Sequence, residues 1–208
     1  MDNAPWLTIL GWGEDGPDGL TATSAKILQD AEIIAGSTRH LDLLQPGCNA
    51  ARFCWPVPFA AGLEPFLALR GKKVVLLASG DPFWFGAGTS ITQHLQPEEW
   101  RALPGLSSFS LAAAALGWPL ESTECLGLHA APLERLRPHL GLHKRLLITL
   151  KDGAMAQKVA QYLCSVGFDR SELTVFERLG GLHQKIRSTR ADGFNLENIE
   201  HPALLAIV

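Results

Sequence analysis

The sequence contains no run of apolar residues longer than a β-strand, and so it offers no candidate for a membrane-spanning helix. The N-terminus also lacks a basic segment followed by an apolar stretch, which argues against a secretory signal. Cysteine is scarce, with 4 residues in 208 and no Cys-x-x-Cys pair. A chain of this length builds its core without disulfides, so we expect reduced thiols and a cytoplasmic protein that binds no membrane.

Positive charge is not in surplus either. The 18 Lys and Arg residues and the 21 Asp and Glu residues give a net charge of −3. Because no basic stripe dominates the sequence, we expect no binding to nucleic acid. An anionic small molecule stays compatible as a substrate, since it needs only a local cationic patch. Apolar residues make up 47% of the chain, enough for one large domain or two small ones.

Signatures of several enzyme classes are missing. The sequence has no Gly-x-Ser-x-Gly elbow of a serine hydrolase and no Walker loop of an NTPase. The 7 histidines do not cluster. His139 and His143 have helical spacing, but Pro138 and Gly141 disfavour a regular helix between them. We therefore expect no metal site.

A glycine-rich loop follows the first predicted strand. Its segment Gly11-x-Gly13-x-x-Gly16 matches the glycine spacing of a dinucleotide-binding motif. That motif needs a helix opening at its third glycine and an acid at the end of the next strand. Here Pro17 delays the helix, and Ala35-Gly36-Ser37 occupies the place of the acid. The loop is therefore expected to approach a ligand closely or to make turns, rather than to bind NAD.

The segment 74–88 is the most informative in the chain. Val74–Ala78 is an apolar run typical of a buried strand, and it ends in Ser79-Gly80-Asp81-Pro82, where proline forbids further pairing. In an open α/β sheet, ligands bind beyond the carboxyl ends of the strands. Asp81 is thus placed to hold hydroxyls or cationic groups of a nucleoside cofactor. The alternative from these residues alone is a tight Asp-Pro turn.

Strands and helices alternate through the first half of the chain, which predicts an α/β fold with a mainly parallel sheet and helices on both faces. Strands are expected near 6–10, 32–35, 73–78 and 100–103, and residues 45–60 are expected to be irregular. The sequence becomes more polar after Gly117-Trp118-Pro119, and this change predicts domains 1–117 and 118–208. Strands expected near 145–150, 173–176, 183–189 and 202–208 predict that the second domain is smaller and mixed α/β.

Taken together, these segments resemble the tetrapyrrole methylases, the S-adenosylmethionine enzymes that modify corrin and porphyrin precursors. The matching series is Leu10-Gly11-Trp12-Gly13, then Ser79-Gly80-Asp81-Pro82, then Ser107-Ser108 after Pro104. Their order and spacing also agree, and the match runs through essentially the whole chain.

Three further segments resemble one branch of the family, the precorrin-6Y methylases, also called cobalt-precorrin-7 C5-methyltransferases. They are Gly36-Ser37-Thr38-Arg39-His40, Leu116-Gly117-Trp118-Pro119 and Leu179-Gly180-Gly181. The chain departs from the branch after the last segment, where Leu182-His183-Gln184-Lys185 replaces a Pro and a Glu-Arg pair. No role is therefore carried over for that pair.

The resemblance implies a two-domain tetrapyrrole methylase fold with the cofactor cleft between the domains, and a homodimer. It implies S-adenosyl-L-methionine as cofactor, leaving as S-adenosyl-L-homocysteine, and no metal. The implied cofactor contacts are Gly80, Asp81, Trp84, Ser107, Ser108, Leu150, Leu179, Gly180 and Ala203. Gly11 and Gly13 resemble the loop that faces the tetrapyrrole, and Arg39, His40 and Arg52 are candidates to hold the carboxylates of the substrate. No catalytic residue is assigned.

The function implied is methylation of a precorrin carbon, C5 above all, in cobalamin biosynthesis. The alternatives are a tetrapyrrole methylase acting at another carbon or on a different substrate, and a non-catalytic nucleotide-binding module. The sequence does not decide whether the substrate carries cobalt. Since Val208 stands inside an apparent strand, a further hypothesis is that the chain is the N-terminal half of a bifunctional C5,15-methyltransferase, fused to a decarboxylating domain.

Overall fold

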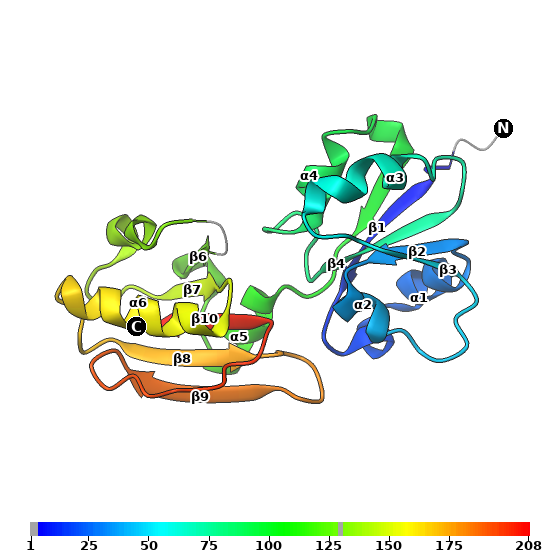
Figure 1. Ribbon diagram of the computed structural model, residues 1–208. Coiled ribbons are helices and arrows are strands. Elements are labelled where there is room, and N and C mark those ends of the chain that lie inside the picture. The colour runs from blue at the N-terminus through cyan, green and yellow to red at the C-terminus, as the bar shows by residue number, and fades with distance from the viewer. Residues whose placement is uncertain (1–3, 129–130) are drawn as a thin grey trace. The chain divides into compact units, whose positions relative to one another are not determined.

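The computed structural model describes residues 4–128 and 131–208 (Figure 1). The chain divides into two compact units, Met1–Ser107 and Ser108–Val208, and in the described residues each has its own five-stranded sheet. None of the described helices has the length and apolar character needed to span a membrane. The α/β class predicted from the sequence is confirmed.

The first unit is built on a parallel sheet with the strand order β3-β2-β4-β1-β5. Its strands are β1 (Leu7–Trp12), β2 (Ile33–Gly36), β3 (Ala51–Cys54), β4 (Val74–Ser79) and β5 (Trp100–Leu103). The α-helices between them are α1 (Ala22–Gln29), α2 (Thr38–Asp42), α3 (Leu63–Leu67) and α4 (Ala87–Thr92). Short 3-10 helices form at η1 (Gly16–Gly19), η2 (Phe59–Gly62) and η3 (Pro97–Glu99).

Helices cover both faces of this sheet because its central strand β4 is apolar on both. Val74, Leu76 and Ala78 pack with residues of α3 and α4. Val75 and Leu77 point to the opposite face and pack with residues of α1 and α2. Figure 1 shows the two helix pairs on opposite sides of the sheet. This continuous burial is typical of a parallel sheet between two helical layers, as the sequence predicts.

The second unit has a mixed sheet with the strand order β6-β7-β10-β8-β9, in which β6 and β7 pair in parallel and the other neighbours are antiparallel. Its strands are β6 (Glu124–Gly127), β7 (Leu146–Thr149), β8 (Glu172–Glu177), β9 (Lys185–Arg190) and β10 (Ala203–Ile207). Its helices are α5 (Ser108–Leu116), η4 (Leu120–Ser122), η5 (Leu133–His139) and α6 (Gly153–Ser165). The predicted mixed domain is confirmed.

Helix α5 belongs to the second unit, whereas the sequence predicts it at the end of the first. Its residues Phe109 and Ala112 share one buried cluster with Leu147, Phe176 and Leu204 of the second sheet, while α6 packs on the opposite face. The units therefore divide between Ser107 and Ser108, earlier than the predicted boundary at residue 117. The glycine and proline after α5 end that helix without ending a domain.

Two strands were not predicted. β3 lies inside the segment expected to be irregular, and β6 follows the predicted boundary. Each has four residues and forms an end strand of its sheet, and β3 is largely exposed. Such a strand takes its hydrogen bonds from one neighbour distant in sequence, and its own side chains carry little of the apolar pattern from which strands are predicted.

Candidate functional site

The last residues of β1 meet the loops after β4 and β5 backbone to backbone at the carboxyl edge of the first sheet. The Gly80 N–H donates to the Trp12 carbonyl (3.0 Å), and the Gly80 carbonyl accepts from the Gly105 N–H (3.1 Å). A Cβ atom on Gly11 would stand 2.0 Å from Gly105 N and 2.3 Å from the Gly80 carbonyl oxygen. This close approach of backbone atoms is sufficient to require glycine at position 11.

The turn after β4 leaves one oxygen of Asp81 available. Gly80 has a φ of +54°, in the left-handed region that glycine adopts most easily, and so the chain turns sharply there. The Oδ1 atom of Asp81 accepts a hydrogen bond from the Phe83 N–H at 2.8 Å. Its Oδ2 atom accepts none from the described residues. The tight turn that the sequence poses as one alternative is present, and the cofactor role of Asp81 stays a prediction.

Three consecutive aromatic residues follow this carboxylate and are exposed. Phe83, Trp84 and Phe85 are 42%, 38% and 50% exposed. The Phe83 ring contacts the ring of Trp100, with 5.5 Å between centroids. Phe85 has a φ of +58°, a conformation that costs a non-glycine residue about 1 kcal/mol. A group of exposed aromatic side chains beside an available carboxylate is typical of a binding surface.

Ser107 lies against the same turn. It is 7% exposed, and its Cα atom is 2.9 Å from the position that a Cβ on Gly80 would take. Ser108 is the first residue of α5 and belongs to the second unit. In the first unit, the structure therefore brings together Gly80, Asp81 and Ser107 from the predicted cofactor contacts.

Four polar side chains form a hydrogen-bonded group beside β4, which we call the Ser79 cluster: Glu14, Arg39, His40 and Ser79. The Arg39 Nη1 atom pairs with the carboxylate of Glu14, whose side chain is 4% exposed. The Arg39 Nη2 atom donates to Ser79 Oγ at 3.0 Å and lies 2.9 Å from His40 Nε2. His40 Nε2 is in turn 3.0 Å from Ser79 Oγ. The predicted substrate residues Arg39 and His40 thus lie together.

The pKa of His40 is lowered to about 4, mainly because the ring is buried and also because the Arg39 guanidinium lies beside it. The backbone of Leu77 acts weakly the other way, although its geometry leaves Nδ1 of the ring buried without a regular hydrogen bond. The imidazole is therefore neutral at physiological pH. A neutral ring beside a guanidinium acts as an acceptor, since guanidinium nitrogens only donate.

The other predicted substrate residues are engaged within the protein. Arg52 lies on β3, and its Nη1 atom donates to the Leu41 carbonyl at 3.3 Å. A Cβ on Gly13 would stand 2.3 Å from the Asp15 carboxylate, so this glycine accommodates an intramolecular contact. Neither observation assigns a ligand to these positions.

In the second unit, backbone groups of three predicted cofactor residues are hydrogen-bonded within the protein. Leu150 and Ala203 are 6% and 7% exposed, and the Leu150 N–H donates to the Ala203 carbonyl at 3.1 Å. Leu179 is buried, and Gly180 has a φ of +83°, with its N–H bonded to the side chain of Gln184 at 2.8 Å. The structure thus makes neighbours of Leu150 and Ala203.

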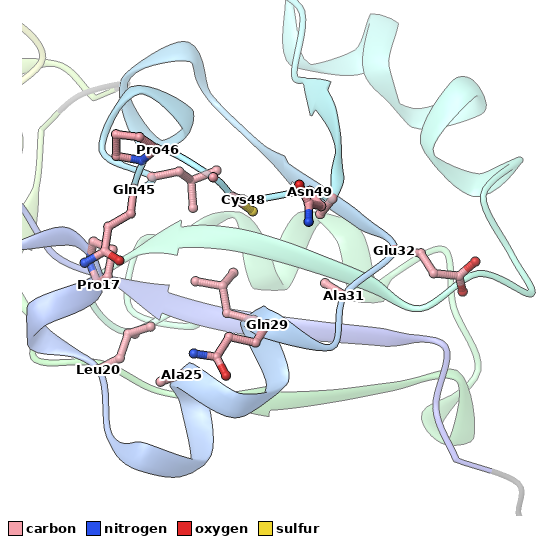
Figure 2. Close-up of a pocket in the computed structure, with 14 residues that line it drawn as sticks. Pro17, Leu20, Ala25, Gln29, Ala31, Glu32, Gln45, Pro46, Cys48 and Asn49 are labelled. Atoms are coloured by element: carbon pink, nitrogen blue, oxygen red, sulfur yellow. The ribbon is translucent and has the colours of Figure 1, made fainter.

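A pocket of about 420 Å³ lies elsewhere in the first unit, between α1 and the segment 44–50 (Figure 2). Leu20, Ala25 and Gln29 line one side of it, and Gln45 and Cys48 line the other. None of the predicted site residues lines this pocket. We place the candidate site at the Gly80 turn instead, because the available carboxylate and the Ser79 cluster lie there.

The histidine pair with helical spacing does not share a helix. The 3-10 helix η5 ends at His139, which pairs with Glu124, and His143 follows in a turn with a φ of +62°. Within residues 4–128 and 131–208, no group of three or more His, Cys, Asp or Glu side chains could hold a metal ion.

Two members of the Ser79 cluster received no role from the sequence. Ser79 is the first residue of the Ser-Gly-Asp-Pro motif, and Glu14 lies in the glycine-rich loop. Both residues therefore belong to motifs that the sequence analysis identified. Their partnership with residues of α2 spans 25 and 40 positions, a separation that no local pattern reveals.

Residues 7–194 match the family model of the Tetrapyrrole (Corrin/Porphyrin) Methylases. The chain belongs to this family. It is 39% identical over 199 residues to a Sinorhizobium sp. protein named precorrin-6Y C(5,15)-methyltransferase [decarboxylating], covering 96% of this chain and 48% of that protein. This methylase chain therefore spans about half the length of that relative.

Two further comparisons extend the similarity of this tetrapyrrole methylase. The cobalt-precorrin-7 C(5)-methyltransferase of Salmonella typhimurium is 26% identical over 180 residues, which cover 86% of this chain and 88% of that one. The solved structure of the uroporphyrin-III C-methyl transferase from Thermus thermophilus, complexed with S-adenyl homocysteine, superimposes with a TM-score of 0.73 at 20% identity. That match covers 97% of this chain and 96% of the other, and it confirms the predicted fold.

Proposed function

We propose that this chain is an S-adenosyl-L-methionine-dependent methyltransferase that methylates a precorrin at C5 in cobalamin biosynthesis. The observation that carries the proposal is the 39% identity to a precorrin-6Y methyltransferase over 96% of the chain. The relative named for cobalt-precorrin-7 points to the same ring carbon. Because the two names differ in cobalt, they support the carbon and leave the metal content of the substrate to experiment.

The turn after β4 has groups that fit a nucleoside cofactor carrying ribose hydroxyls and an ammonium group. The Oδ2 atom of Asp81 is available to accept from a hydroxyl or an ammonium group. The exposed indole of Trp84 offers an apolar surface for a purine. Gly80 and the buried Ser107 lie at the same turn, where glycine leaves no side chain in the way of a ligand. We propose these four residues as cofactor contacts in the first unit.

The remaining cofactor contacts rest on the family resemblance. We propose that the second unit contributes Ser108 and the backbone of Leu150, Leu179, Gly180 and Ala203. For the substrate we propose Gly11, Gly13, Arg39, His40 and Arg52. Since the guanidinium of Arg39 is already paired with Glu14, its proposed task is to present a fixed donor rather than a mobile charge.

Methyl transfer requires the protein mainly to position the substrate and the cofactor. The cofactor, when bound, supplies a methyl group on a sulfonium, which is electrophilic without further activation. The protein residues then align the ring carbon with that methyl group and keep water from it, and alignment alone lowers a barrier by several kcal/mol, on the order of 7 or more in favourable cases.

Calorimetry with S-adenosyl-L-homocysteine, followed by methyl transfer to purified precorrin intermediates, tests the proposal. We expect micromolar binding, and turnover with the intermediate whose C5 is unmethylated. Turnover with a different methylation position would favour the alternative of a methylase for another precorrin carbon. Failure to bind the cofactor product at micromolar concentration would favour a non-catalytic nucleotide-binding module and contradict the proposal.

We also propose a homodimer in the cytoplasm, as the resemblance implies. Sedimentation equilibrium should return a mass near 45 kDa for this chain, roughly twice the 22.5 kDa of one copy. A mass of one copy at micromolar concentration would contradict the dimer. Fusion to a decarboxylating domain stays a prediction. The mass of the native polypeptide tests it directly.

A further inference from the structure

The Ser79 cluster has a geometry that binding alone does not require. Ser79 ends β4 and is exposed, and its neighbour in sequence is Gly80 of the candidate site. Behind its hydroxyl lies the imidazole of His40, which is 6% exposed. The hydroxyl of this exposed residue contacts a buried imidazole at 3.0 Å, and so it connects the surface of the site with an interior base.

The contacts define where the ring proton of His40 resides. Arg39 Nη2 can only donate, and it lies 2.9 Å from His40 Nε2. In the neutral ring, Nε2 is therefore the unprotonated nitrogen, and the proton is on Nδ1, towards the backbone of Leu77. The lone pair of Nε2 is consequently shared between Arg39 and the hydroxyl of Ser79.

Methylation of a ring carbon that carries hydrogen creates a need for a proton acceptor. When the new carbon–carbon bond has formed, the carbon–hydrogen bond at the same atom must break, and its electron pair returns to the conjugated ring. Such a proton is acidic, so a weak base suffices to remove it. A ring that stays neutral above about pH 4 is available as that base throughout the physiological range.

We propose that Ser79 takes this proton from the substrate carbon while passing its own hydroxyl proton to Nε2 of His40. The inference rests on the proposed function and adds the acceptor that the reaction needs. The proton from carbon forms the new O–H bond of Ser79, the former hydroxyl proton forms the N–H bond on Nε2, and His40 becomes an imidazolium. Release of that proton to water by the reverse path restores the neutral ring. Ser79 is then a catalytic residue, and His40 acts through it.

Glu14 makes the proton transfer electrostatically feasible. An imidazolium would lie 2.9 Å from the Arg39 guanidinium, and two cations this close repel. The Glu14 carboxylate, buried and paired with the same guanidinium, offsets one of the two charges. The cluster then carries a single net positive charge after the transfer, beside a substrate that is itself anionic.

Two substitutions and a deuterated substrate test the inference. His40→Gln keeps an acceptor for Ser79 and Arg39 but removes the base, and Ser79→Ala removes the relay. We expect kcat to fall about 100-fold or more in both variants, while KM changes much less. With deuterium on the methylated carbon, a primary isotope effect on kcat should appear in His40→Gln, because proton removal has become slow. His94→Gln, in the exposed turn that follows α4, is the matched control and should behave as wild type.

Three outcomes would overturn the inference: an unchanged kcat in either variant, a loss of kcat without an isotope effect in His40→Gln, or loss of folding by circular dichroism only in variants that lose activity. For the last case, Ser79→Thr supplies the second measurement, since it retains the hydroxyl and should retain most of the turnover. Binding of S-adenosyl-L-homocysteine should stay within about twofold of wild type in all variants. If the wild-type protein does not bind it, the proposed function fails, and that failure is distinguishable from failure of the relay.

Discussion

Asp81 divides its carboxylate between structure and the proposed cofactor, since Oδ1 closes the turn to Phe83 and Oδ2 accepts no hydrogen bond from the described residues. We expect Asp81→Ala to weaken S-adenosyl-L-homocysteine binding about 10- to 100-fold, the effect of losing a charged hydrogen bond of about 1.5–3 kcal/mol. Calorimetry measures the affinity. Asp81→Asn is the matched variant, because its amide oxygen can still close the turn while the charge is lost. Wild-type affinity in Asp81→Ala would remove the residue from the site.

His40 gives a stability signature that is independent of activity. Its pKa is about 4 in the folded chain and 6.5 in the unfolded chain, so the unfolded state binds the extra proton between these values. The free energy of unfolding should therefore fall as the pH is lowered from 6.5 to 4, by about 3 kcal/mol from this residue, and level off below. Urea titrations at several pH values should show this slope in the wild type and lose it in His40→Gln. Parallel pH profiles for the two proteins would show that His40 is not held neutral.

Site residues that belong to a local sequence motif were predictable, whereas site residues that only the fold brings together were not. Asp81 follows a buried strand and precedes proline, so its place at a carboxyl strand end is readable from the sequence. Arg39 and His40 were named from the branch resemblance alone. Ser79 and Glu14 join them only because β1, β2 and β4 are neighbours in the sheet, which brings their following loops to one edge.

The end of β1 and the loops that follow β4 and β5 depend on glycine for their contact. Gly11→Ala would place a Cβ within 2.0 Å of Gly105 N, which overpacks backbone against backbone. We expect a loss of about 3 kcal/mol or more in the free energy of unfolding, from denaturant titration. Gly193→Ala is the control, since no atom lies within 4 Å of its added Cβ, and its change should stay below about 0.5 kcal/mol. Equal stability of the two variants would contradict the close packing of these loops.

The strand predictions succeeded for the central strand β4 and for the end strand β5, but missed the end strands β3 and β6. β4 and β5 lie where the apolar runs place them, within one residue at each end. Helix α6 begins after Asp152, whose side chain accepts from the Met155 N–H at 2.9 Å, as a residue at that position of a helix commonly does. β3 and β6 were missed because these four-residue strands carry little of the buried apolar pattern from which strands are predicted.

The division of the chain at Ser107 can be tested with fragments. Each unit has its own buried clusters, so we expect fragment 1–107 to unfold cooperatively in urea. Fragment 1–117 adds α5 without its partners Leu147, Phe176 and Leu204, and should gain no stability. A higher midpoint for the longer fragment would return α5 to the first domain, where the sequence predicts it.

Methyl transfer from S-adenosylmethionine labelled with ¹³C in its methyl group tests the proposed function most directly. The chain is incubated with each unmethylated precorrin intermediate in turn, and the product is read by ¹³C NMR. We predict a single enriched methyl signal bonded to C5 of the macrocycle. Enrichment at a different carbon, or none with any intermediate at full cofactor occupancy, would contradict C5 methylation as the activity of this chain.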